Sequence, residues 1–245
     1  MDSKNIAISL VNIFKTFVVS DKSFQTVKDR IFNFHKKDNK RKIFALKNIS
    51  LEIEKGECVG LIGRNGSGKS TLTKIMSGAF EPDKGGKIIR NGSSMLMNLG
   101  VGFSHELTAR ENIYVNGSTL GLKIKEIDEL FNDIISYAEL EDFVDTKIKY
   151  FSSGMVQRLS FSIAIYAKAD ILFLDEIFAV GDEKFRQKAT KTLEDNWLKG
   201  RTVIIVSHSP ELIEKYCSKT ILMNKGEMIF YGNSKEALEK YNSIL

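Results

Sequence analysis

Two shortages in this 245-residue sequence exclude whole classes of protein: it has little cysteine and no long hydrophobic run. Its two cysteines, Cys58 and Cys217, lie far apart along the chain and lack the spacing of a metal site or a disulfide framework. We therefore expect two ordinary thiols, as in a cytosolic protein. No stretch of about 18 to 20 apolar residues occurs, so no membrane-spanning helix is predicted. If the protein serves a membrane process, another polypeptide must do the spanning.

The sequence also lacks a recognisable leader, internal repeats and low-complexity tracts. No small-residue cleavage site follows the first apolar residues, Ile6–Leu10, which favours a first strand over a signal peptide. The net charge of +5, from 36 basic and 31 acidic residues, suits a protein that works near phosphates, anionic lipid or nucleic acid. A hydrophobic content of 42% allows a sizeable core, in one large domain or two small ones.

The strongest pattern that is present is a phosphate-binding loop between an apolar strand and a helix. It reads Gly63-Arg64-Asn65-Gly66-Ser67-Gly68-Lys69-Ser70-Thr71 and fits the motif G-x-x-x-x-G-K-S. The glycines allow a tight turn that points backbone N–H groups at phosphate oxygens, while the helix N-terminus and Lys69 supply positive charge. Ser70 is placed to ligate Mg²⁺. The alternative of a glycine-rich turn with a chance lysine is disfavoured by the strand before it and the helix after it.

Strand and helix periods alternate along the rest of the chain. Strands are predicted at 6–18, 43–54, 87–90, 94–104 (with a glycine loop), 171–175 and 202–207, with a turn at Lys225-Gly226 before a final strand and helix. Residues 108–145 follow a helical period. Residues 19–42 form an insertion in which Phe24, Val27, Ile31 and Phe34 have helical spacing, followed by a basic run. Two interpretations stay open: a basic amphipathic helix at a membrane surface or membrane partner, or a surface helix docked on its own domain.

Acidic residues end the predicted strand 171–175. Asp175 is placed to hold Mg²⁺ through water, and Glu176 beside it to orient and polarise an attacking water. Between the phosphate loop and this strand lies Phe151-Ser152-Ser153-Gly154-Met155-Val156-Gln157-Arg158. In isolation its Ser-Ser-Gly would be an ordinary helix cap and turn.

The order of these segments resembles the nucleotide-binding subunit of ABC transporters over nearly the whole chain. The resemblance implies one α/β nucleotide-binding domain spanning residues 1–245, with a RecA-like core, an N-terminal antiparallel β subdomain and a helical subdomain at about 100–165. It implies ATP and Mg²⁺ as cofactors. It also implies two copies that associate head to tail, each sandwiching ATP between its own phosphate loop and Ser152, Ser153 and Gly154 of the other copy. Here Ser153 stands where the family usually has Gly, and Met155 where Gln is common.

Further roles follow from the same resemblance. His208, after the strand 202–207, is similar to the family's switch histidine, which meets the γ-phosphate, and Ala179-Val180-Gly181-Asp182 is similar to the loop that links paired subunits. Asp182 is equally well explained as a helix cap. Phe17 is the best match for the aromatic ring that stacks on adenine, with Phe14 as its competitor. Asn98 stands where the family usually has a Gln that ligates Mg²⁺ and senses the membrane partner.

One subfamily is matched in more detail. Its markers are Leu99-Gly100-x-Gly102-Phe103, Glu106-Leu107-Thr108-x-Arg110-Glu111-Asn112-Ile113, the Ser152-Ser153-Gly154-Met155 variant and Ala179-Val180-Gly181-Asp182. These resemble ATP-binding subunits that export bacterial surface polysaccharides such as O-antigen, capsular polysaccharide and teichoic acid. The insertion at 19–42 also resembles a helix that these subunits place near the membrane. Some members carry a C-terminal carbohydrate-binding domain, which we do not expect in this chain.

The resemblance therefore implies an ATPase that powers export of a lipid-linked polysaccharide through an integral-membrane permease dimer. Its expected location is peripheral, on the cytoplasmic face of the inner membrane, without nucleic acid as a partner. Two alternatives stay open: an ABC exporter ATPase for another cargo, and a soluble ABC ATPase that acts on ribosomes or DNA. A phosphate-loop kinase is disfavoured, because the stretch 151–158 indicates hydrolysis by a dimer.

Overall fold

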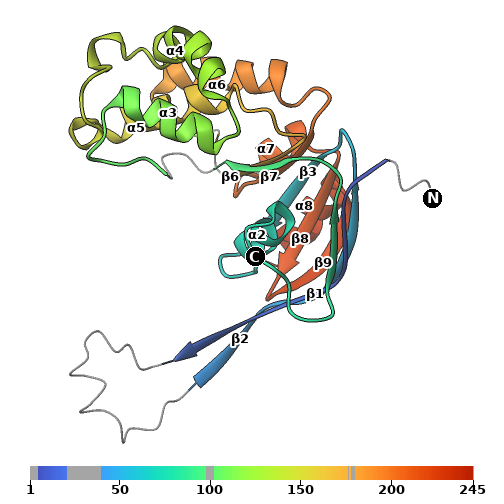
Figure 1. The fold of residues 1–245 in the computed structure, drawn as a ribbon. Coiled ribbons are helices and arrows are strands. Elements are labelled where there is room, and N and C mark those ends of the chain that lie inside the picture. The colour runs from blue at the N-terminus through green and yellow to red at the C-terminus, as the bar shows by residue number, and fades with distance from the viewer. Residues whose placement is uncertain (1–4, 21–39, 98–101, 176, 178–179, 245) are drawn as a thin grey trace, which may run out of the picture.

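The computed structural model describes residues 5–20, 40–97, 102–175, 177 and 180–244, and shows an α/β fold built on two sheets (Figure 1). The smaller sheet is antiparallel and contains β1 (Ile6–Ser20), β2 (Lys40–Glu54) and β4 (Lys87–Arg90), in the order β2-β1-β4. The larger sheet has the order β5-β6-β7-β3-β8-β9. Its strands are β3 (Cys58–Gly63), β5 (Ser94–Met97), β6 (Ile171–Asp175), β7 (Thr202–Val206), β8 (Lys219–Asn224) and β9 (Glu227–Asn233).

Helices cover the larger sheet and extend beyond one end of it (Figure 1). They are α2 (Lys69–Ser77), α3 (Ala109–Thr119), α4 (Ile124–Ala138), α5 (Ser153–Ala164), α6 (Glu183–Asn196), α7 (Pro210–Tyr216) and α8 (Ser234–Ser243). Two 3₁₀ turns, η1 (Glu141–Phe143) and η2 (Ile148–Tyr150), lie between α4 and α5. No helix within the described ranges is long and apolar enough to cross a membrane.

The strand sequences explain the sheet arrangement. Strands β6 and β7 are buried on both faces, as their continuous apolar runs require, and they pair in parallel. Ile171 and Phe173 face a core shared with β1, β2 and α2, whereas Leu172 and Leu174 face a second core shared with α6. This alternation is the period of two of a strand. The second half of β2 alternates buried and exposed residues because one face of the small sheet is open to solvent.

A third apolar cluster holds α3, α4 and α5 together, with Ile113, Ile134 and Leu159 fully buried in it. The α/β class with an N-terminal antiparallel sheet, expected from the sequence, is confirmed. The boundaries differ in detail, since β1 reaches Ser20 and β5 ends at Met97. The insertion at 19–42 lies outside the described residues except at its two ends, where β1 finishes and β2 begins.

The two cysteines are neighbours in space. The Sγ atoms of Cys58, at the start of β3, and Cys217, directly after α7, are 3.6 Å apart. The hydrogen-bond contact with Cys58, and then burial, raise the pKa of the Cys217 thiol. Their separation along the sequence gave no sign of this contact.

Candidate functional site

The phosphate-binding loop joins β3 to α2 and leaves the start of that helix open. Gly68, the N-cap residue, has φ 106°, and neither a side-chain cap nor an acidic residue in the first turn occupies the helix N-terminus. By contrast α3, α5, α6 and α7 each begin with a side-chain oxygen that accepts a backbone N–H. The uncapped N–H groups and the helix dipole make the start of α2 suited to an anion.

Backbone packing requires glycine at two positions of this loop. A Cβ on Gly63 would lie 2.3 Å from the carbonyl oxygen of Met223, and one on Gly68 would lie 2.7 Å from that of Ala45. Such distances are far below van der Waals contact. The neighbouring strands therefore hold the loop tightly and leave its N–H groups on the open side.

Lys69 lies within the curve of the loop. Its side-chain Nζ donates to the carbonyl oxygens of Gly63, at 2.7 Å, and Arg64, at 3.2 Å. The residue is only 7% exposed, so its charge is largely removed from water. Ser67 has a buried hydroxyl without a hydrogen-bond partner among the described residues.

A cleft of about 690 Å³ opens over the phosphate loop. It is lined by Asn65, Gly66, Ser67, Gly68, Lys69, Ser70 and Thr71 of the loop, by Ile43, Phe44 and Ala45 of β2, and by Gln157, Asp175, Val206 and His208. The cleft thus brings the phosphate loop together with Asp175, at the end of β6, and His208, which follows β7. Gly63 and Arg64 belong to the loop but do not line this cleft.

Asp175 and His208 line the same cleft because β6 and β7 are adjacent and parallel. Asp175 pairs in register with Val206, and both end their strands at the same edge of the sheet. This is the edge at which open α/β sheets bind ligands. His208 is held in a tight turn, because Ser207 accepts a hydrogen bond from the Ser209 N–H and Ser209 caps α7.

The oxygen donors at the cleft are of the kind that Mg²⁺ prefers. Ser70 offers a hydroxyl on the first turn of α2, and Asp175 offers a carboxylate from the end of β6. Mg²⁺ sites beside nucleotides commonly use one or two such protein ligands together with phosphate oxygens. The residues present therefore fit this ion. Asn98 and Glu176, the other residues assigned to metal and water by the sequence, lie outside the described residues.

The aromatic wall of the cleft is not the one that the sequence singled out. Phe44 of β2 lines the cleft and is 59% exposed. Phe17 is half-buried and packs edge-on against Phe80, with ring centroids 6.0 Å apart, and neither it nor Phe14 is among the described lining residues. The local sequence does not indicate Phe44, because its place beside the loop depends on the packing of β2 against Gly68 and Gly226.

The residues assigned to contact ATP in a second copy lie outside the cleft. Ser152 and Ser153 are exposed at the start of α5, where the Ser152 hydroxyl accepts the N–H of Met155 at 3.2 Å. The helix-cap interpretation of Ser152 is thus correct within one chain. A Cβ on Gly154 would meet only the Ser152 hydroxyl, at 3.9 Å, so the space beside this glycine is open among the described residues.

Gln157, which the sequence did not single out, links two parts of the site. It lines the cleft, and its side-chain oxygen accepts the N–H of Gly181 at 3.2 Å. Asp182, next in the chain, caps α6 by accepting the N–H of Phe185 at 2.9 Å. The loop that precedes α6 is therefore tied to α5.

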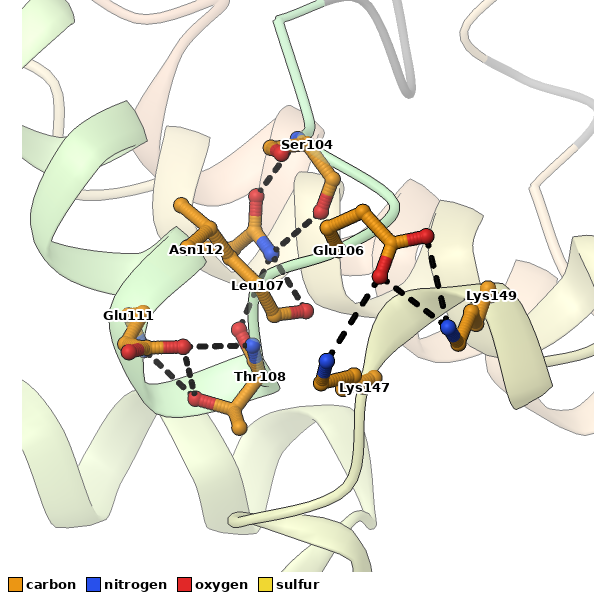
Figure 2. Close-up of polar contacts among 8 residues, drawn as sticks. All are labelled: Ser104, Glu106, Leu107, Thr108, Glu111, Asn112, Lys147 and Lys149. Carbon is orange, nitrogen blue, oxygen red and sulfur yellow. Dashed lines mark hydrogen bonds and ion pairs between the residues drawn. The ribbon is translucent and has the colours of Figure 1, made fainter.

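A network of polar contacts fixes the segment that leads from residue 102 into α3 (Figure 2). Asn112 is fully buried, accepts the Ser104 N–H at 2.9 Å, and has its amide nitrogen within 3.2 Å of the carbonyl oxygens of Ser104, Leu107 and Thr108. Thr108 and Glu111 form a capping box at the start of α3.

Glu106 bridges the same segment to the chain between η1 and α5 (Figure 2). It forms ion pairs with Lys149 at 3.0 Å and Lys147 at 3.5 Å. The hydrogen bond from Lys149 lowers the pKa of the Glu106 carboxyl. Within residues 106–113, Glu106 thus ties the segment to the chain before α5, and Thr108 and Glu111 cap the start of α3.

Comparisons with known proteins identify what this chain is similar to. A family model described as ABC transporter matches residues 46–179. The chain is 38% identical over 205 residues to the O-antigen export system ATP-binding protein RfbB of Klebsiella pneumoniae, covering 84% of this chain and 83% of that protein. It is 37% identical over 244 residues to the teichoic acids export ATP-binding protein TagH of Listeria innocua, covering 99% and 71%. Its fold is similar to a dimeric ATP-binding cassette solved in a post-hydrolysis state with ADP and phosphate, with TM-score 0.70, 23% identity and coverage of 93% and 98%.

Proposed function

Because this chain belongs to the ABC transporter family and is an ABC-type ATPase, we propose that it hydrolyses ATP to power export of a lipid-linked surface polysaccharide. The observation that carries the hydrolytic part is the cleft that joins the phosphate loop to Asp175 and His208. The cargo is supported by the similarity to RfbB and TagH, which are named as ATP-binding proteins of O-antigen and teichoic acid export. Both are polymers of the bacterial surface.

ATP binds with its phosphates over the start of α2. The N–H groups of the loop and the ammonium of Lys69 neutralise phosphate charge, and more strongly so as charge develops on the γ-phosphate. Mg²⁺, when bound by Ser70 and Asp175, supplies further charge neutralisation, with Asn98 as an additional oxygen donor. Phe44, or Phe17 as the sequence suggested, supports the adenine base.

Glu176 orients and polarises the attacking water, and His208 donates a hydrogen bond to the γ-phosphate. Two copies of the chain close on each other, so that Ser152, Ser153 and Gly154 of one meet the ATP bound by the other. Opening and closing of this dimer drives an integral-membrane permease dimer. The subunit is then peripheral, on the cytoplasmic face of the membrane.

Affinity purification from membranes of the native cell tests this function. The purified material is examined by mass spectrometry for permease subunits and for lipid-linked glycans. A Lys69→Ala chain, in which nucleotide binding is impaired, is purified in parallel as the matched sample. We expect a stoichiometric multi-span permease together with a lipid-linked polysaccharide. A permease that carries a drug, peptide or lipid would overturn the cargo. Recovery with ribosomes or DNA and no permease would overturn export altogether, while the ATPase assignment would stand.

A further inference from the structure

The turn between β8 and β9 lies directly against the phosphate-binding loop. Gly226, in this turn, donates its N–H to the carbonyl oxygen of Ser67 at 2.9 Å and accepts the N–H of Lys47 at 2.8 Å. One residue thus bridges the phosphate loop to β2, although the three segments are far apart along the chain. Gly226 is buried and is not among the described residues that line the cleft.

Close backbone packing surrounds this bridge. A Cβ on Gly226, whose φ is 86°, would lie 3.0 Å from the carbonyl oxygen of Ala45 and 3.2 Å from that of Phe44. On the other side, a Cβ on Gly68 would lie 2.7 Å from the same Ala45 oxygen. The Ala45 carbonyl therefore lies between Gly68 of the phosphate loop and Gly226 of the β8–β9 turn, and neither glycine has a side chain that would separate the backbones.

The bridge joins the two walls of the cleft. Phe44 and Ala45 line one wall, and Ser67 and Gly68 line the wall that receives phosphate. The distance between these walls decides whether one ligand can contact both, and positioning of this kind is sensitive to shifts of less than 1 Å.

We propose that Gly226 is a positioning residue for nucleotide binding, which sets the spacing between the β2 wall and the phosphate loop. The proposal rests on the proposed ATPase function and adds to it a residue outside the phosphate, metal and signature motifs. A ligand that contacts both walls depends on this spacing, whereas a ligand that contacts only the phosphate loop does not.

A pair of glycine substitutions separates positioning from general stability. Gly226→Ala forces a Cβ into the packed space, and Gly121→Ala is the matched control. Gly121 has nearly the same backbone angle, φ 88°, but a Cβ there would meet nothing within 4 Å. Both variants carry the strain of alanine at positive φ, so both should unfold at a lower temperature than the unsubstituted chain. Only Gly226→Ala should alter the cleft.

Equilibrium binding of ATP and of inorganic tripolyphosphate is measured for the three chains, together with steady-state hydrolysis. For Gly226→Ala we expect ATP affinity to fall about tenfold and KM to rise by a similar factor. The value of kcat should stay within about twofold of the unsubstituted chain, because bound ATP and the transition state lose the same binding energy. Tripolyphosphate, which reaches only the phosphate loop, should lose less than about threefold. Gly121→Ala should bind both ligands as the unsubstituted chain does.

Three results would overturn the proposal: unchanged ATP affinity in Gly226→Ala, an equal loss for tripolyphosphate, or an equal loss in Gly121→Ala. If Gly226→Ala does not fold, Gly226→Asn tests the same contact, since asparagine tolerates positive φ better and still carries a Cβ. Failure of the unsubstituted chain to bind ATP would instead refute the proposed function itself.

Discussion

Lys69 keeps a charged group in a place that is nearly closed to water. A buried ammonium is costly unless it is fully hydrogen-bonded, and the carbonyl oxygens of Gly63 and Arg64 meet part of that need. The same contacts hold the side chain along the loop before any ligand arrives. The little reorganisation that remains on phosphate binding is what electrostatic stabilisation of a developing charge requires.

The two candidate aromatic residues should respond differently to truncation. Phe44→Ala removes an exposed ring that lines the cleft, so we expect ATP affinity to fall by about fivefold with little change in stability, because base stacking on a ring contributes about 1 kcal/mol. Phe17→Ala removes a ring packed on Phe80 and should mainly lower the free energy of unfolding. Binding titrations and denaturant unfolding of both variants measure this. The opposite outcome would restore Phe17 as the residue that supports adenine.

The role of Glu176 is tested by an isosteric change. Glu176→Gln retains size and hydrogen bonding but cannot polarise water as a carboxylate does, so we expect normal ATP binding and loss of nearly all turnover. Glu183→Gln, an exposed acid at the start of α6, is the control and should hydrolyse ATP normally. Hydrolysis at the unsubstituted rate by Glu176→Gln would remove this residue from the mechanism.

At the scale of elements, the starts of helices explain why parts of the site were predictable. The phosphate-binding loop before α2 depends on contiguous residues, so the sequence alone indicates it. The presence of Asp175 and His208 in one cleft also follows, because Asp175 ends one buried strand of the sheet and His208 follows the neighbouring parallel strand.

Other features depend on contacts between residues that are distant in sequence, and such contacts could not be predicted from the sequence alone. The place of Phe44 at the cleft depends on the packing of β2 against the phosphate loop and Gly226. The Gln157–Gly181 hydrogen bond depends on the docking of α5 beside its loop, and the Cys58–Cys217 contact on the packing of α7. None of these has a local signature, since tertiary packing alone decides them.

Asn112 should be the most costly polar residue of the helical layer to remove. Asn112→Ala leaves the Ser104 N–H without its acceptor and removes the amide contacts with three carbonyl oxygens, each of which keeps a backbone N–H partner. We therefore expect the free energy of unfolding to fall by about 2 kcal/mol. Asn116→Ala is the matched change one turn later and should cost about 1 kcal/mol, because Asn116 makes its closest contact, at 3.1 Å, with a carbonyl inside the same helix. Urea unfolding of the two variants measures the difference. Equal losses would show that the segment before α3 does not depend on this side chain.

At the scale of the whole molecule, the proposed function takes each hydrolytic site from two chains. The phosphate loop, Asp175 and His208 share one cleft, whereas the start of α5 with Ser152 is exposed and lies outside it. We propose that a second copy, related by a twofold axis, places its exposed α5 start at the cleft of the first, and the reverse. This arrangement is the central claim of the account.

Mixing two inactive variants tests that claim most directly. Lys69→Ala disables the phosphate loop and Ser152→Arg disables the start of α5, so each variant alone should lack ATPase activity. In a mixed dimer one site combines both defects and the other combines neither. With random mixing, we expect the equimolar mixture to recover about a quarter of the unsubstituted ATPase rate per chain. A mixture that stays as inactive as its components would show that each site is built from a single chain, and would contradict the account.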